Sequence, residues 1–413
     1  MCVESIILRT FAGRNKTLII MNKIFCFLTA LMLMTACGQR TASTGDADKA
    51  STADTTVTVE VNYATEFSVR DSAGIRLVDV GSHYHFALIP ASLTVPEGSL
   101  TVPEGSPKVP EGYTPIRVPI RRALCMTALQ LSNFTALDAH DFISGITGTK
   151  NLFNADIRQR TDDGRIVKIG MEGNFDTEMV LAANPDVIFI SPSKRGGYDA
   201  IKETGITLVP HLGYKELDPL GQAEWIKFVG LFIGREAEAN AIFAGIEQRY
   251  NELKKRVEEK LDQAAAQGLT HLRPTIISGE MHYGSWHAVG GKNYLAQIFR
   301  DAGADYVIHD DETSGENLEF EKAYALAADA DYWRILNSFP GDFSYEALRA
   351  SEPRNELFKA FRERKVIYCN MRKTPYYEIS PVQPDVLLKD LVAILHPELV
   401  ESDYQPTFYQ LLK

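Results

Sequence analysis

The sequence predicts an α/β protein with two lobes, each built on a mainly parallel sheet, joined by one long rigid helix and preceded by a small N-terminal β-meander. Three observations favour this fold class. From Ile120 onward, short apolar segments alternate with helical stretches, which is typical of parallel sheets covered by helices. The alternation occurs in two series of similar size, and one long helical pattern separates them. The 413 residues are 45% hydrophobic and 23% charged, which is enough apolar material for two lobes of ordinary size.

The first part of the chain is typical of an exported protein. Residues 21–36 carry one lysine, an apolar run too short to span a bilayer, and small residues directly before Cys37. The run Leu-Met-Thr-Ala-Cys that ends there resembles a bacterial lipobox, in which the cysteine is lipidated. We expect residues 1–36 to be an over-long start plus a signal peptide, and residues 37–57 to be a lipid anchor and flexible tether. The alternative is a buried N-terminal helix with a chance cysteine.

The other cysteines and the net charge exclude some classes of protein. Cys125 and Cys369 each lie in a strand-like apolar run, so buried free thiols are expected rather than a disulfide scaffold. The formal net charge of −11 argues against nucleic acid as a partner.

Residues 58–115 are expected to form a β-meander that carries an exposed loop. Apolar and polar residues alternate there, and Val-Pro-Glu-Gly occurs three times, from Val95, Val102 and Val109. A proline in each repeat excludes a helical heptad and favours an extended loop.

The two lobes and the helix between them follow in order. The N-terminal lobe is expected over residues 116–234, with strands at 120–126, 142–146, 186–191 and 206–210. The C-terminal lobe is expected over residues 268–413, with strands at 274–278, 305–308, 332–336 and 365–370. Residues 235–267 place apolar side chains at spacings of three and four, which predicts a helix with one apolar stripe. Such a helix would extend on the order of 45 Å, long enough to cross both lobes.

Short motifs follow one another in each lobe, and one arrangement of glutamate, helix and strand occurs in both. In the first lobe, a glycine run at 170–174 leads into Asp176-Thr177-Glu178, then Leu-Ala-Ala-Asn-Pro-Asp-Val-Ile-Phe at 181–189, and then Gly-Ile-Thr-Leu-Val at 205–209. In the second lobe, Gly290–Leu295 and Ala302–Ala304 precede Phe320-Glu321-Lys322 and Ala330-Asp331-Tyr332-Trp333, which repeat the glutamate, helix and strand of the first lobe.

Over about residues 115–398 these motifs resemble the periplasmic binding proteins of ABC importers, in the class with a helical backbone that carries cobalamin, ferric siderophores or haem. Asp176 stands where asparagine is usual in that class. The resemblance implies two Rossmann-like lobes with the ligand held between them.

Ligands of open α/β sheets bind outside the carboxyl ends of the strands. The loops expected there are rich in aromatic and cationic side chains, which suit a large ring-rich ligand with acidic groups. Tyr214, Trp286 and Tyr376 are the residues we expect most to line the cleft, and the alternative is that half of the set packs the lobes or lies on the surface. The expected ligand-binding residues are Phe153, Met171, Glu172, Lys194, Arg195, Tyr198, Tyr214, Lys215, Tyr283, Trp286, His287, Phe339, Arg372, Tyr376 and Tyr377.

Two glutamates at matching places on the lobes are candidates for docking. In the family that the chain resembles, such a pair meets arginines of the membrane subunits, and here the pair would be Glu178 and Glu321. As ordinary glutamates at helix N-termini they would only favour the helix dipole.

No metal site of the protein itself is expected, because the nine histidines show no metal-ligand spacing. Met281, His282, Tyr283 and His287 carry groups that can serve as axial ligands of a haem iron, although loop histidines are more often surface residues.

Together with the export signal, the resemblance implies a lipid-anchored receptor on the periplasmic side of a bacterial membrane that delivers an iron complex or a corrinoid to an ABC permease. No catalytic residue is expected, because there is no Gly-x-Ser-x-Gly elbow and Val289–Asn293 is not a phosphate loop. No resident cofactor is expected, although the transported ligand can itself contain iron or cobalt. Two alternatives stay open: an extracytoplasmic enzyme acting on a tetrapyrrole or metal chelate, and a non-transport scaffold lipoprotein.

Overall fold

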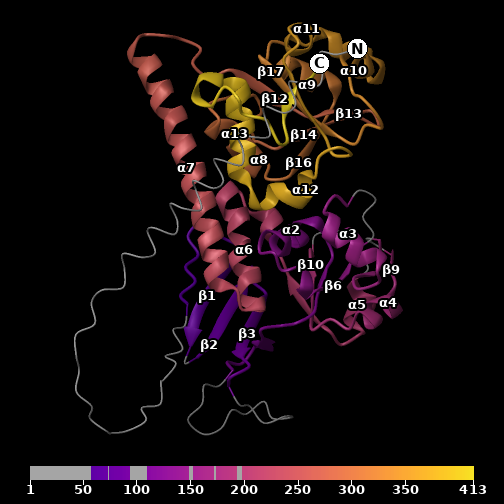
Figure 1. Cartoon of the computed structure of the whole chain (residues 1–413). Coiled ribbons are helices and arrows are strands. Elements are labelled where there is room, and N and C mark those ends of the chain that lie inside the picture. The colour runs from indigo at the N-terminus through magenta and orange to yellow at the C-terminus, as the bar shows by residue number, and fades with distance from the viewer. Residues whose placement is uncertain (1–56, 73, 94–108, 148–151, 172–173, 193–197) are drawn as a thin grey trace, which may run out of the picture. The chain divides into compact units, whose positions relative to one another are not determined.

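The structure is a computed structural model, and it describes residues 57–72, 74–93, 109–147, 152–171, 174–192 and 198–413 (Figure 1). The predicted signal peptide, the lipidation of Cys37 and the first two Val-Pro-Glu-Gly repeats lie outside the described residues. No helix in the described part of the chain is long and apolar enough to cross a membrane.

The N-terminal sheet has four strands, of which the first three form the predicted meander. β1 (Phe67–Ser72), β2 (Ile75–Val80) and β3 (Tyr84–Pro90) pair antiparallel, but β4 (Thr114–Val118) pairs parallel with β3. A parallel partner needs a crossover connection. The segment 91–113, which carries the Val-Pro-Glu-Gly repeats, is that connection.

The first lobe is built on a five-stranded parallel sheet in the order β11-β10-β5-β6-β7. The order reverses between β10 and β5, so the switch point of this sheet lies between these two strands. Every strand predicted for this lobe overlaps one of these, whereas the two-residue β7 was not predicted. The strands are β5 (Ala123–Cys125), β6 (Ile143–Ile146), β7 (Val167–Lys168), β10 (Val187–Ile190) and β11 (Thr207–Pro210). The other elements are α2 (Ala128–Ala136), α3 (Ala155–Asp162), the hairpin β8 (Gly170–Met171) and β9 (Asn174–Phe175), α4 (Thr177–Ala183) and α5 (Tyr198–Lys202).

The second lobe repeats the plan with the sheet order β15-β12-β17-β18-β19, in which only β19 is antiparallel. Its switch point lies between β12 and β17. The strands are β12 (Thr275–Ser278), β15 (Asp305–Tyr306), β17 (Tyr332–Asn337), β18 (Val366–Asn370) and β19 (Gln410–Leu411). A second, antiparallel sheet holds β13 (Glu280–His282), β14 (Ser285–Val289) and β16 (Gly315–Leu318). The helices are α8 (Tyr294–Asp301), α9 (Phe320–Ala327), α10 (Tyr345–Ser351), α11 (Lys359–Arg362), α12 (Tyr376–Ile379) and α13 (Pro384–Leu395).

The repeat seen in the sequence has a structural cause at two aspartates. Asp186 directly precedes β10, and its Oδ2 accepts the backbone N–H groups of Arg121 and Arg122 at 2.7 and 2.9 Å. Asp331 directly precedes β17, and its Oδ2 accepts the backbone N–H of Thr275 at 2.9 Å. Each carboxylate thus fastens the start of one strand to the start of its neighbour, at the same place in both lobes.

The long helix is α7 (Glu236–Ala266), 31 residues where the pattern predicts a helix over 235–267. It packs on α6 of the first lobe and on α13 of the second, and Figure 1 shows it running beside both. Its buried residues recur at spacings of three and four: Ala239, Phe243, Ile246, Tyr250, Leu253, Val257 and Leu261.

The helix before it, α6 (Pro219–Ile233), is buried along its whole length. Glu224 is fully buried in α6, pairs with Lys227 at 2.8 Å, and accepts the backbone N–H groups of residues 62–64. Glu216 accepts those of Thr65 and Glu66 in the same way. The segment that leads into β1 is therefore fastened to the first lobe by two buried carboxylates.

Both cysteines of the lobes, Cys125 and Cys369, are free and buried, as predicted. Burial raises the pKa of both thiols, that of Cys369 to about 11, so neither is a reactive thiolate at neutral pH.

Candidate functional site

The carboxyl edges of the two parallel sheets face the same boundary. In the first lobe the end of β5 leads into α2, and in the second lobe the end of β18 leads into α12. The helices α2 and α12 pack against each other, and the turn Ser380–Val382 packs on both α2 and α6. Figure 1 shows α12 beside α2 where the lobes meet. Because ligands of α/β sheets bind at carboxyl edges, this boundary is the candidate site.

On the second-lobe side, a polar network joins the ends of β12 and β17 to the middle of β18. Nδ2 of Asn337, the last residue of β17, donates to Glu280 Oε2 at 3.2 Å, and the Tyr368 hydroxyl donates to Asn337 Oδ1 at 2.9 Å. Burial raises the pKa of the half-buried Glu280 carboxyl. These residues were not predicted. The only sequence signal for Glu280 and Asn337 was their position at or just after a strand end, and Tyr368 in the middle of β18 lacked even that.

Aromatic rings stand beside this network. Phe343 stacks on Tyr368 with ring centroids 4.6 Å apart, and Phe339 meets Phe343 edge-on at 5.1 Å. The exposed Arg372 donates from Nε to the Ser338 carbonyl at 2.8 Å. The predicted residues Phe339 and Arg372, far apart in the sequence, thus lie together at this edge.

A hydrogen bond joins the two lobes beside two further predicted residues, Phe153 and Tyr377. The backbone N–H of Phe153, just before α3, donates to Glu378 Oε1 at 2.7 Å. Tyr377, next to Glu378 on α12, is 54% exposed. One aromatic residue of each lobe therefore lies at the same hydrogen-bonded junction.

On the first-lobe side, the switch point is filled by the protein itself. Gln130 is fully buried; its Oε1 accepts the N–H groups of Met126 and Thr127, and its Nε2 donates to Ser191 Oγ at 3.2 Å. Burial also lowers the pKa of His211 to about 3, so this ring is neutral.

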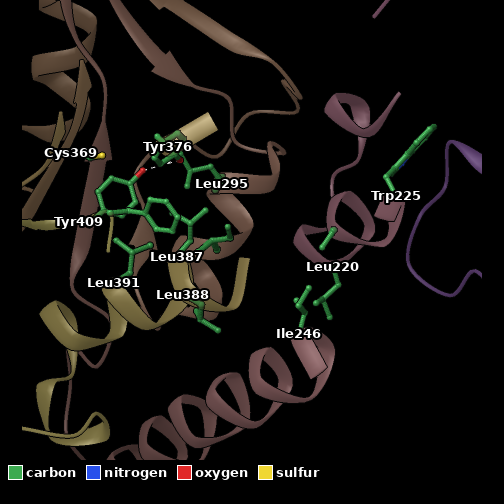
Figure 2. Packing of buried hydrophobic residues seen from close by; sticks show 14 of the residues in the cluster. Leu220, Trp225, Ile246, Leu295, Cys369, Tyr376, Leu387, Leu388, Leu391 and Tyr409 are labelled. Carbon is green, nitrogen blue, oxygen red and sulfur yellow. Dashed lines mark hydrogen bonds between the residues drawn. The ribbon is translucent and has the colours of Figure 1, made fainter. Parts of the chain in front are cut away.

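Three predicted cleft residues are buried in the core, and the prediction that they present a face to a ligand is wrong. Trp286 has no exposed surface, because the alternation along β14 turns it onto Trp333, at 5.2 Å between ring centroids. Tyr376 is 2% exposed, and its hydroxyl accepts a hydrogen bond of 3.0 Å from that of Tyr409. Figure 2 marks this bond with a dashed line. Tyr198 is 9% exposed, and its hydroxyl bonds the Ser191 backbone.

The other predicted residues stay predictions. One of them, His287, borders the polar network, because it is the cross-strand partner of Glu280 in the β13–β14 hairpin. Those at the surface are Met171, Lys215, Tyr283 at the β13–β14 turn and His287; Tyr214 is half-buried, and its hydroxyl has no partner among the described residues. Glu172, Lys194 and Arg195 lie outside the described residues.

The two docking candidates occupy equivalent positions. Glu178 is the second residue of α4 and Glu321 the second residue of α9, and both are exposed. Asp176 caps α4 by accepting the N–H groups of Glu178 and Met179, a role that asparagine fills equally well. Glu321 differs in its neighbourhood, since its carboxylate pairs with Arg354 at 2.9 Å.

Known proteins share both the sequence pattern and the fold. A family model described as periplasmic binding protein matches residues 125–372. An uncharacterized lipoprotein of Methanocaldococcus jannaschii is 26% identical over 297 residues, which are 68% of this chain and 67% of that relative. A periplasmic haem-binding protein of Pseudomonas aeruginosa has the same fold, with a TM-score of 0.55 at 18% identity over 71% of this chain and 98% of that one. A protein of an ABC-type Fe3+-hydroxamate transport system from Saccharomonospora viridis gives 0.51 at 16% identity, over 67% of this chain and 94% of that one. Because the family match covers more than half of its length, this chain belongs to the periplasmic binding protein family.

Proposed function

We propose that this protein is the substrate-binding receptor of an ABC importer, and that it captures an iron complex, either a siderophore or haem, or a corrinoid such as cobalamin. The observation that carries the proposal is the boundary of α2 and α12, which the carboxyl edges of both sheets face. There the polar and aromatic groups around Glu280 and Tyr368 belong to the second lobe, and Phe153 belongs to the first. Structural relatives that bind haem or belong to Fe3+-hydroxamate transport support this class of cargo.

The residues at the boundary suit such a cargo. Phe339 and Tyr377 offer aromatic faces to a ring-rich ligand, and Arg372 offers a cation to its acidic groups. Glu280 and Asn337 offer an acceptor and a donor. Iron or cobalt enters as part of the cargo, so the receptor needs neither a resident cofactor nor catalytic residues.

The receptor works outside the cytoplasm, held to the membrane through a lipid on Cys37. The lipoprotein relative supports this anchoring. Delivery uses Glu178 and Glu321 as docking points for the permease, because two exposed carboxylates at equivalent places on the lobes can fix the register of the complex.

A thermal-shift panel on a soluble form that begins at Ser43 tests the proposal, with cobalamin, cobinamide, haem and several ferric siderophores as ligands. A true cargo at about 100 times its Kd stabilises the folded protein by about 2.7 kcal/mol and raises the Tm by a few degrees. Phe339→Ala and Arg372→Ala should reduce the shift, whereas the surface control Glu258→Ala should not. A flat response across the panel would refute this cargo class, and chemical conversion of a bound compound would favour the enzyme instead.

A further inference from the structure

The four-residue helix α12 has a different partner on each of its sides. Tyr376 faces the core, where its hydroxyl meets Tyr409 and accepts from Nη2 of the buried Arg334 at 3.5 Å. Tyr377 is 54% exposed, although burial raises the pKa of its hydroxyl. Glu378 reaches the opposite lobe, where it accepts two backbone N–H groups.

The contact of Glu378 with the first lobe is bidentate. Its Oε1 accepts the N–H of Phe153 at 2.7 Å, and its Oε2 accepts the N–H of Asn154 at 3.0 Å. Both bonds are partly buried, and a charged acceptor makes them stronger than bonds between neutral groups. Two bonds from one rigid carboxylate also fix an orientation, so the contact constrains where the start of α3 can lie.

Both ends of this contact are firmly held. In the second lobe, Arg334 is 5% exposed and donates hydrogen bonds to three neutral hydroxyl groups, those of Ser278, Tyr376 and Tyr409. This network fixes α12 to β12, to β17 and to the C-terminal segment. The contact therefore has a stable base in the second lobe.

In the first lobe, α3 is held by its own contacts. Ile157 is fully buried, and Asn154 Oδ1 accepts the Ile157 N–H at 3.0 Å. Arg160 pairs with Asp156 at 2.7 Å and also with Asp141, which lies outside α3. Because α3 is attached to the first lobe by these contacts, a change in the position of its first residues should move the lobe with it.

We propose that Glu378 is an interlobe latch: by holding the N–H groups of Phe153 and Asn154, it sets the spacing of the two ligand-facing edges. The latch adjoins Phe153 and Tyr377, so a ligand that enters between these two residues must open it; that consequence rests on the proposed function. The latch itself does not depend on any ligand, and its test uses none.

The first measurement is amide hydrogen exchange at Phe153 and Asn154 in the ligand-free protein. Glu378→Ala should speed their exchange roughly tenfold or more, because both N–H groups lose a charged acceptor. Glu378→Gln should have a smaller effect, since its single oxygen can still accept. Glu258→Ala, an exposed site on α7, is the matched control and should change nothing at these amides.

The second measurement asks whether the lobes move, which a purely local cap would not cause. Residues 57–413 form one compact unit, so a form beginning at Ser43 retains all of it. Spin labels on Glu203→Cys in the first lobe and Asn317→Cys in the second, both exposed, report the interlobe distance, while the native thiols are buried. Glu378→Ala should broaden the distance distribution, and Glu258→Ala should not.

Unchanged amide exchange in Glu378→Ala overturns the latch outright. Faster exchange with an unchanged distance distribution also overturns it, because Glu378 would then be only a local cap of α3. If Glu378→Ala does not fold, the same two measurements on Glu378→Gln decide. A flat response in the ligand panel leaves these outcomes unaffected, so failure of the latch and failure of the proposed cargo are distinguishable.

Discussion

Replacing Glu224 by glutamine should destabilise the protein more than any surface change. Glu224 is fully buried, pairs with Lys227, and accepts the backbone N–H groups of residues 62–64 at distances from 2.7 to 3.1 Å. Glutamine removes the negative charge, and its NH2 group is a donor that cannot accept from those backbone N–H groups. Lys227 keeps its hydrogen bond to the Glu60 carbonyl at 2.8 Å. Removing one partner of a buried ion pair costs about 3–5 kcal/mol of stability. Because Lys227 still donates to the Glu60 carbonyl, we expect a loss at the lower end, about 3 kcal/mol.

Urea unfolding of the wild type, Glu224→Gln, Lys227→Met and the double variant measures this loss. Lys227→Met should cost less, because Glu224 keeps its backbone donors, and the two changes should couple by about 1 kcal/mol or more. Limited proteolysis gives a local readout, since residues 57–66 should become cleavable in Glu224→Gln first. A loss below about 1 kcal/mol together with an unchanged cleavage pattern would refute the assignment of Glu224 as the residue that fastens this segment.

Three further predictions concern the core, pH and the Val-Pro-Glu-Gly connection. Trp286→Ala should cost about 3–5 kcal/mol in urea unfolding, whereas Phe339→Ala should cost far less and instead weaken ligand binding; a reversed pattern would contradict the burial of Trp286. His211 has its pKa lowered to about 3 from 6.5, so the unfolded chain binds the extra proton between these values, and stability should fall by up to about 1.4 kcal/mol per pH unit as pH drops below 6.5. His211→Asn should flatten that dependence in unfolding measured from pH 7 to 5. Deleting residues 95–101, one seven-residue repeat, should change the free energy of unfolding by only about 0.3 kcal/mol, because loop closure depends weakly on length.

The parallel sheets and α7 could be predicted because their sequence signals are local. Every strand predicted from an apolar run overlaps a strand of the two sheets, and the predicted helix range of 235–267 differs from α7 by one residue at each end. α6 could not be predicted, because a helix that is buried on every side shows no periodic alternation of apolar and polar residues. The charged residues Glu224 and Lys227 also interrupt its apolar run. β7 and β19 have two residues each, too few for any periodicity.

The candidate site was only partly predictable, because composition does not say which way a side chain turns. Tyr376 and Tyr377 are adjacent aromatic residues with the same sequence signal, yet one is 2% and the other 54% exposed. The difference comes from Arg334 and Tyr409, which hold the Tyr376 hydroxyl from distant parts of the chain. Glu378 carried no signal at all, since its partners are backbone N–H groups of the other lobe.

The two lobes bridge their switch points with related but unequal chemistry. In the first lobe, the buried amide of Gln130 joins the end of β5 to Ser191 after β10, and all of its bonds stay within the protein. In the second lobe, Glu280 after β12 joins Asn337 at the end of β17, but this carboxyl is half-buried and its pKa is raised by burial. An amide that makes all of its hydrogen bonds within the protein has little left with which to bind a ligand. A half-buried carboxyl is stabilised by any hydrogen-bond donor that a ligand brings to it. For the proposed cargo, polar selectivity should therefore come mainly from the second lobe, so Glu280→Gln should alter ligand preference in the thermal-shift panel while Gln130→Ala alters stability.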